Sequence, residues 1–374
     1  MLVRLSLLLV VAVPAFAKVL VVDPGESIQA AVDAAAPGDT VLVKPGVYHE
    51  AGQPCPFDGS ETCAVVLSTD QVRLRGVSSR AKSVVLENAG GQAYGIAAVK
   101  PDVDPSTCLI DFTNRLRGTQ IRGFTVRGFD HTGILLLCAD GWRLTKNAAN
   151  DNAEYGIFPS HCGAGRVSHN VATGSNDTGV YIGQSHDVRI DRNVATGNVS
   201  GFEIENSTRV RLDHNTATGN TGGILSFTLH FLDVKQNTDN LIDLNQVHDN
   251  NKPNTCLDPE DAVCGVPQGT GILLVAADRN VVKGNTVKNN QAFGIGVVDF
   301  CASQNIPPAI CAQLDIDPSS DGNQVGQNVA QGNGSDPTFA PLNVDLAWDG
   351  TGTNNCWKVN IFDTQFPDPL PTCP

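Results

Sequence analysis

Residues 189–205 read RIDRNVATGNVSGFEIE, and this stretch holds the features of an internal repeat. Asn193 is followed five residues later by Asn198, and three residues after that Gly201 opens an apolar segment. The two ends of the stretch alternate polar and apolar residues, which is the two-residue period of a β-strand. Asparagine tolerates left-handed backbone geometry and suits tight corners. The stretch therefore predicts short strands separated by asparagine corners.

The same unit recurs over most of the chain. Successive first asparagines are separated by 23, 23, 22, 30, 40 and 43 residues. The short intervals define a coil of about 22–23 residues, and the long ones contain insertions at 229–240, 251–268 and 300–321. The first asparagines are Asn147, Asn170, Asn193, Asn215, Asn245, Asn285 and Asn328. The second asparagines are Asn152, Asn198, Asn220, Asn250, Asn290 and Asn333, with Asn176 one residue late.

A single coil cannot bury its apolar face, so about ten coils are expected to stack around one core. This predicts an all-β fold, a single-stranded right-handed parallel β-helix, with inward asparagines bonded in ladders at a rung spacing of about 4.8 Å. Residues 18–374 form one domain in this interpretation. Residues 18–50 supply the first coil and a cap, with a helix from Ser27 to Ala36, and residues 343–374 cap the other end.

The opening stretch, residues 22–50 (VDPGESIQAAVDAAAPGDTVLVKPGVYHE), followed by the asparagine repeats, resembles the pectin-lyase-like family of right-handed β-helix repeat proteins. The resemblance covers nearly all of the chain after residue 17. That family includes polysaccharide lyases, glycoside hydrolases, mannuronan epimerases, phage tailspikes and periplasmic proteins of other roles. The resemblance implies the fold, and it makes a polysaccharide the expected partner.

The first residues indicate the compartment. Arg4 precedes an apolar run that ends in Ala15-Phe16-Ala17, which is typical of a signal peptide cleaved after Ala17. We therefore expect a secreted or periplasmic protein. The formal net charge of −14 disfavours nucleic acid as a partner, and the sequence predicts no membrane insertion.

The 11 cysteines suit an oxidising compartment. Their spacing predicts four local disulfides, namely Cys55–Cys63, Cys256–Cys264, Cys301–Cys311 and Cys356–Cys373. Cys108, Cys138 and Cys162 remain, so at least one thiol stays free unless it forms an intermolecular bond. Whether Cys138 pairs with Cys162 on an adjacent rung is open.

Stacking the coils places polar side chains on three rungs of the glycine-initiated strand. Glu203 and Glu205 face the same way, about 6.6 Å apart along the strand, and they are the candidate acid and base. Tyr181 lies one rung from Glu203 and His161 one rung further, as accessory catalytic groups. The alternative is a solvated outward face, which is the usual state of two glutamates at this spacing.

A second strand of each coil carries a basic column. Its members are Arg143, Arg166, Arg189 and Arg211. Guanidinium groups at rung spacing suit the successive carboxylates or sulfates of an acidic glycan, so these residues, with Gln184, are the predicted substrate-binding set. In the alternative interpretation, Arg189 and Arg211 pair with Asp191 and Asp213 in an exposed ladder.

Residues 155–161 read YGIFPSH and resemble the mannuronan-epimerase motif Tyr-Gly-(Phe/Ile)-Asp-Pro-His. Phe158 occupies the position of the motif's aspartate, and Ser160 is inserted before His161. The acid that would neutralise a uronate is therefore missing from this stretch.

Together these observations predict a secreted or periplasmic protein that binds, and cleaves as a lyase or hydrolase, a polysaccharide of acidic or neutral type on its lateral face. The alternative is a non-catalytic binding or scaffold module. The histidines lack tight metal-ligand spacing, so neither a metal nor a cofactor is expected.

Overall fold

The computed structural model describes residues 17–77, 83–109 and 113–374. The predicted signal peptide therefore lies outside the described residues, apart from Ala17. No helix within the described ranges is long and apolar enough to cross a membrane.

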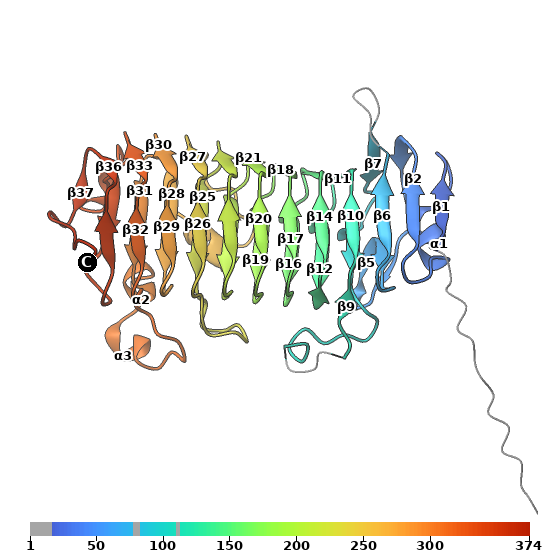
Figure 1. The fold of residues 1–374 in the computed structure, drawn as a ribbon, viewed down its shortest axis with the longest axis horizontal. Helices are drawn as coiled ribbons and strands as arrows, with labels where there is room; N and C mark the ends of the chain where they lie inside the picture. Colours follow the sequence, from blue (N-terminus) through green and yellow to red (C-terminus); the bar gives the residue numbers. More distant parts are fainter. Residues whose placement is uncertain (1–16, 78–82, 110–112) are drawn as a thin grey trace, which may run out of the picture.

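In the described part of the chain, three long sheets of 12, 11 and 12 strands run the length of the molecule. Over most of the stack, strands that follow one another in sequence belong to different sheets, and each strand pairs in parallel with its equivalent in the next coil. Figure 1 shows the resulting elongated stack, which runs from β1 (Val19–Val22) at one end to β37 (Gln365–Phe366) at the other. The predicted right-handed parallel β-helix is confirmed, and we name its sheets I, II and III.

Sheet I consists of β1 (Val19–Val22), β2 (Thr40–Val43), β6 (Arg73–Gly76), β10 (Gln120–Arg122), β14 (Arg143–Thr145), β17 (Arg166–Ser168), β20 (Arg189–Asp191), β23 (Arg211–Asp213), β26 (Leu241–Asp243), β29 (Val281–Lys283), β32 (Gln324–Gly326) and β35 (Cys356–Lys358). Sheet II consists of β3 (Gly46–Tyr48), β7 (Val84–Glu87), β11 (Phe124–Arg127), β15 (Ala148–Asn150), β18 (Val171–Thr173), β21 (Val194–Thr196), β24 (Thr216–Thr218), β27 (Gln246–His248), β30 (Thr286–Lys288), β33 (Val329–Gln331) and β36 (Ile361–Phe362).

Sheet III consists of β4 (Gln53–Cys55), β5 (Asp58–Leu67), β8 (Tyr94–Ala98), β12 (Thr132–Leu137), β16 (Tyr155–Ser160), β19 (Thr178–Gly183), β22 (Ser200–Glu205), β25 (Gly222–Phe227), β28 (Thr270–Val275), β31 (Phe293–Val298), β34 (Leu346–Trp348) and β37 (Gln365–Phe366). Its β4 and β5 are antiparallel. The short strands β9 (Leu116–Arg117) and β13 (Ala139–Asp140) pair outside the three long sheets.

Buried asparagines link each coil to the next. The Asn193 side chain accepts from the Asn170 backbone N–H at 2.8 Å, and its own amide donates to Asn215 Oδ1 at 2.9 Å and to the Val167 carbonyl at 3.0 Å. The second ladder passes through Ser175, whose N–H donates to Asn198 Oδ1 at 3.0 Å. Asn176, which the repeat places one residue late, lies outside this ladder and donates to the Ala153 carbonyl at 3.0 Å instead.

The N-terminal helix is shorter than expected. Helix α1 spans Ile28–Asp33, and Ser27 is its N-cap, with the hydroxyl accepting from the Ala30 N–H at 3.1 Å. Ile28 and Val32 are buried and join the interior core of the β-helix. The Ser27 cap is confirmed, although the predicted helix extended to Ala36.

All four predicted local disulfides are present. Cys108 pairs with Cys138, across a sequence separation of 30 residues, and Cys162 is free and buried. The remaining short elements are α2 (Phe300–Ser303), α3 (Pro308–Cys311) and the 3₁₀ turns η1 (Ala262–Gly265) and η2 (Pro337–Phe339).

Replacing Asn193 with alanine should lower the free energy of unfolding by about 2–4 kcal/mol, because the Asn170 N–H and the Val167 carbonyl would lose their buried partner. Urea denaturation followed by circular dichroism would measure this loss. Gln246→Ala, at an exposed position on β27, is the matched control. Equal losses for the two variants would contradict a stabilising role for the ladder.

Candidate functional site

A cavity of about 310 Å³ lies over sheet III, against β16, β19, β22, β25 and β28. All three predicted insertions contribute to its walls, so they gather on one side of the stack. Its polar lining residues are Tyr155, Asp177, Tyr181, Glu203, Glu205, Asp261 and Gln304. Its apolar lining includes Phe158, Leu225, Phe227, Leu229, Phe231, Leu232, Val263, Val266, Leu273, Val275 and Phe300.

Strand pairing brings the central residues of the site together. Tyr181 pairs with Glu203, as the repeat predicted, and Gly183 pairs with Glu205. The Tyr181 ring stacks on Phe158, with centroids 4.2 Å apart and planes 4° from parallel. A Cβ atom at Gly183 would lie 1.9 Å from the Tyr181 hydroxyl, so only glycine leaves room for this ring. Phe158 therefore supports Tyr181 at the place where the epimerase motif has an acid.

Three carboxyl groups share the cavity and are almost entirely buried. Burial, together with the negative charge of Asp177, raises the pKa of Glu205 to about 8. The same two causes raise the pKa of Glu203 well above its ordinary value. Burial is also the main reason that the pKa of Asp177 rises to about 6. At neutral pH, Asp177 is therefore the most readily ionised member of the cluster and Glu205 retains its proton.

Asp177 and Tyr155 were not among the sequence-predicted site residues. Asp177 directly precedes β19, and Tyr155 begins β16. A hydrogen bond from Tyr155 lowers the Asp177 pKa and partly offsets the effect of burial. The sequence contains one signal for Asp177, because this coil has an extra residue between Ser175 and Thr178, and Asn176 is displaced by one position from the repeat.

The described residues that line the cavity include no lysine, arginine or histidine. Asp261 adds a further carboxyl at the wall, where burial and the charges of Asp258 and Glu154 raise its pKa. A ligand carboxylate would enter this site without a cationic partner, which is unfavourable in a desolvated environment. The cavity therefore favours an uncharged or positively charged ligand.

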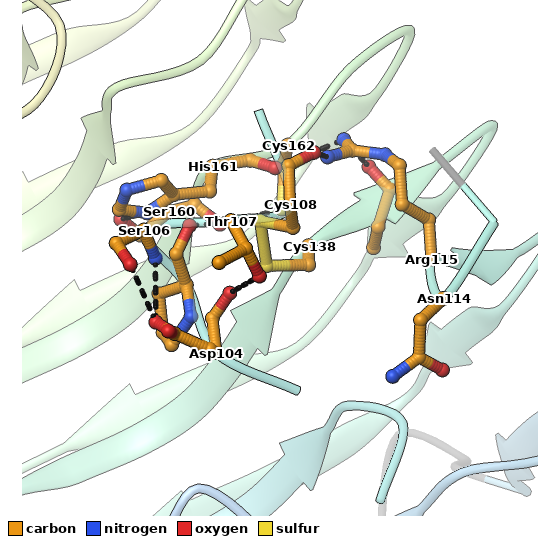
Figure 2. Close-up of a disulfide and its surroundings, with 12 residues drawn as sticks. Asp104, Ser106, Thr107, Cys108, Asn114, Arg115, Cys138, Ser160, His161 and Cys162 are labelled. Carbon is orange, nitrogen blue, oxygen red and sulfur yellow. Dashed lines mark hydrogen bonds between the residues drawn. A yellow bond between two sulfur atoms is a disulfide. The ribbon is translucent and has the colours of Figure 1, made fainter. Parts of the chain in front are cut away.

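His161 follows β16 but does not line the cavity. Figure 2 shows it beside Asp104 and Ser106, near the Cys108–Cys138 disulfide. Its Nδ1 is 2.9 Å from the Ser160 hydroxyl, and its Nε2 is 3.7 Å from Asp233. Burial lowers the His161 pKa and the Asp233 carboxylate opposes that effect. The structure thus places His161 between two loops, apart from the glutamates.

Gln184 supports the wall of the cavity. Its side-chain oxygen accepts from the Asp233 and Val234 backbone N–H groups at 2.9 and 3.2 Å. One rung further, Asn206 exchanges hydrogen bonds with the backbone of Leu229, at 2.8 Å in each direction. The two side chains hold the 229–240 insertion, which supplies three of the apolar lining residues.

The arginine column lies on sheet I, with Arg143, Arg166, Arg189 and Arg211 in register as predicted. Arg166 forms a two-bond ion pair with Asp191 at 2.7 Å, and Arg189 forms one with Asp213 at 2.9 Å. Arg211 contacts Asp213 at 3.1 Å and Asp243 at 3.2 Å. Arg143 has no carboxylate partner among the described residues.

Fold and site together define a right-handed parallel β-helix protein with a buried carboxyl cluster in a lateral pocket. The family model described as "Periplasmic copper-binding protein (NosD)" matches residues 63–263, which is more than half of the 374 residues. The chain belongs to this NosD family. No curated protein sequence matches it.

Solved structures with the same fold include the A-module of the mannuronan C-5 epimerase AlgE4 of Azotobacter vinelandii. It is 17% identical, with a TM-score of 0.63 over 91% of this chain and 93% of that chain. A double mutant of the periplasmic alginate epimerase AlgG is 15% identical, with a TM-score of 0.58 over 92% of this chain and 73% of that one. The Dettilon tailspike protein is 14% identical, with a TM-score of 0.55 over 91% and 68% of the two chains. At these identities the likeness concerns the fold.

The side chains of the described residues do not fit a copper ion. No group of three or more His, Cys, Asp or Glu side chains in the described ranges could hold a metal. The only methionine is Met1, so a thioether donor is missing from the rest of the chain. Ten cysteines are in disulfides, and burial raises the pKa of the remaining Cys162 thiol to about 12.

The buried glutamate makes stability depend on pH. The Glu205 carboxyl has an ordinary pKa of 4.5 and a folded-state pKa of about 8, so the folded protein holds a proton that the unfolded chain releases. Stability from this group is therefore lost as pH rises through that window. Glu205→Gln should gain about 2–4 kcal/mol relative to the native protein between pH 5 and pH 8. Urea denaturation at several pH values measures the difference.

Glu61→Gln, at an exposed carboxyl on β5, is the matched control for that comparison. A difference between Glu205→Gln and the native protein that stays constant with pH would show that Glu205 is not protonated in the folded state.

Proposed function

We propose that this protein acts on a polysaccharide outside the cytoplasm, by hydrolysing a glycosidic bond of an uncharged sugar bound in the lateral pocket. The observation that carries the proposal is the cluster of Asp177, Glu203 and Glu205 in a pocket with largely apolar walls. The periplasmic description of the family and the five disulfides support the compartment. Structural neighbours described as a mannuronan C-5 epimerase and a periplasmic alginate epimerase support a polysaccharide as the ligand class.

Hydrolysis needs one carboxyl group that donates a proton and one that is ionised. Glu205, with a pKa of about 8, is suited to protonate the leaving oxygen at neutral pH. Asp177, with a pKa of about 6, is suited to be the carboxylate that activates water or attacks the sugar. Glu203 stands beside both, and its proton keeps the cluster from carrying three charges. Tyr181 hydrogen-bonds Glu205 and faces the reacting groups as the accessory residue.

The charge of the pocket argues against elimination or epimerisation of a uronate. Both reactions place negative charge next to a sugar carboxylate, which a cation normally stabilises. The described lining of this pocket supplies carboxyl groups and tyrosines instead. A volume of about 310 Å³ lies at the low end for ligand pockets, so it suits a chain end better than a chain running along the flank.

The apolar walls favour a second candidate function, which is binding without cleavage. Leucine, valine and phenylalanine side chains dominate the lining, and few hydrogen-bond donors face the space. In this case the glutamates would orient a sugar or another small ligand and no bond would be broken. Product analysis separates the two candidates.

On a panel of neutral glycans and polyuronates, we expect reducing ends to be released from a neutral glycan. Glu205→Gln and Asp177→Asn should each lower kcat by about 10²–10⁴-fold, because each removes a proton-transfer group. Glu87→Gln, at a surface ion pair with Arg127, should retain the native rate. Release of unsaturated products from polyuronates would overturn the assignment. Ligand binding without any product would favour the binding module.

A further inference from the structure

The N-terminal rungs of sheet I carry an excess of positive charge. The outward side chains of β6, β10 and β14 include four arginines, and a lysine follows β14 at the corner. We call this set the cationic patch: Arg73, Arg75, Arg122, Arg143 and Lys146. All five side chains belong to exposed residues, and the three strands lie side by side in Figure 1.

No carboxylate in the described part of the chain forms an ion pair with the cationic patch. Arg73 donates one hydrogen bond to the Gly38 carbonyl at 3.1 Å, and its remaining donors are free for a ligand. The next rungs of the same sheet differ, because Asp191, Asp213 and Asp243 stand in the column where Arg75 and Arg122 lie. The sheet therefore neutralises its arginines on later rungs and leaves those of the patch uncompensated.

The strand register also places like charges next to each other. Arg75 pairs directly with Arg122 on the adjacent rung, at a spacing of about 4.8 Å. Arg73 and Arg143 flank Gln120 in the neighbouring column. Like charges directly opposite one another destabilise a sheet, and a bound anion removes that repulsion. The protein has a formal net charge of −14, so this concentration of guanidinium groups on one rigid surface is opposite in sign to the overall charge.

We infer that the cationic patch binds a linear anionic polysaccharide, with successive carboxylates or sulfates of the chain paired to guanidinium groups on successive rungs. Guanidinium groups bind these anions through two parallel hydrogen bonds. A flat row of short parallel strands presents them at regular intervals, which matches a polymer with one charge per sugar ring. The five disulfides are typical of an oxidising compartment outside the reducing cytoplasm.

This surface is separate from the lateral pocket. The patch belongs to sheet I, whereas the carboxyl cluster belongs to sheet III. The inference therefore stands independently of the proposed hydrolysis. It assigns the two sites opposite preferences, with an anionic polymer held at the patch and an uncharged sugar in the pocket.

The test measures binding of the full chain to size-defined polygalacturonate oligomers by calorimetry at several salt concentrations. Native protein should bind them, and the affinity should fall as salt screens the charges. The double variant Arg75→Gln plus Arg122→Gln should bind about tenfold more weakly and show a smaller salt dependence. The matched control is Lys283→Gln plus Lys358→Gln, which removes the same charge from exposed positions on the C-terminal rungs of sheet I.

Circular dichroism and thermal unfolding would establish that both double variants keep the native fold, and all four substitutions are at exposed positions. Three results would overturn the inference. These are no binding by native protein at low salt, an equal loss in both double variants, and tighter binding to anionic phospholipid vesicles or DNA than to the oligomers. Loss of hydrolysis in Glu205→Gln with unchanged oligomer binding would show that the two sites act separately.

Discussion

The alignment of each coil with the next depends on hydrogen bonds made by buried asparagines. Backbone pairing alone leaves a parallel strand free to slip, because every residue offers the same donor and acceptor. A buried amide such as Asn193 bonds both neighbouring coils and would be left without partners by a shift of one residue. Insertions of very different length, up to an interval of 43 residues between first asparagines, are accommodated because the ladder resumes after each one.

The same alignment places the candidate site. Since Tyr181 and Glu203 are fixed as neighbours on adjacent rungs, the position of the carboxyl cluster relative to the aromatic stack follows from the repeat. The insertions then cover this outward face of sheet III and exclude water from it. Gln184 and Asn206 hold the 229–240 segment by backbone hydrogen bonds, and burial together with the charge of Asp177 raises the pKa of Glu205. A strand pair that would be solvated in a bare helix becomes a buried cluster.

The sequence predicted what is periodic or local. Strand register, the Ser27 cap and four disulfides of short span follow from spacing, so they were accessible without coordinates. Asp177 was missed because it lies outside the strand columns. The three insertions were located, but their wall residues could not be identified because insertions have no repeat to align. The arginine column was predicted, and the same-strand pairs Arg189–Asp191 and Arg211–Asp213 are present. The sequence did not predict that an arginine of the column also reaches an aspartate on the next rung, as Arg166 reaches Asp191, since a long side chain spans the distance between rungs.

The two candidate interaction surfaces differ from the rest of the molecule because their charged groups lack partners of opposite charge. Elsewhere on the helix, arginines meet carboxylates on an adjacent rung, as Arg189 meets Asp213 and Arg279 meets Asp239. The described lining of the lateral pocket has several carboxyl groups and no cation. The cationic patch has five cations, and no acid among the described residues forms an ion pair with them. Both arrangements are unfavourable in the isolated chain, the first through desolvation and the second through repulsion. The pocket has an excess of carboxyl groups and the cationic patch has an excess of positive charge, so the two surfaces favour different ligands.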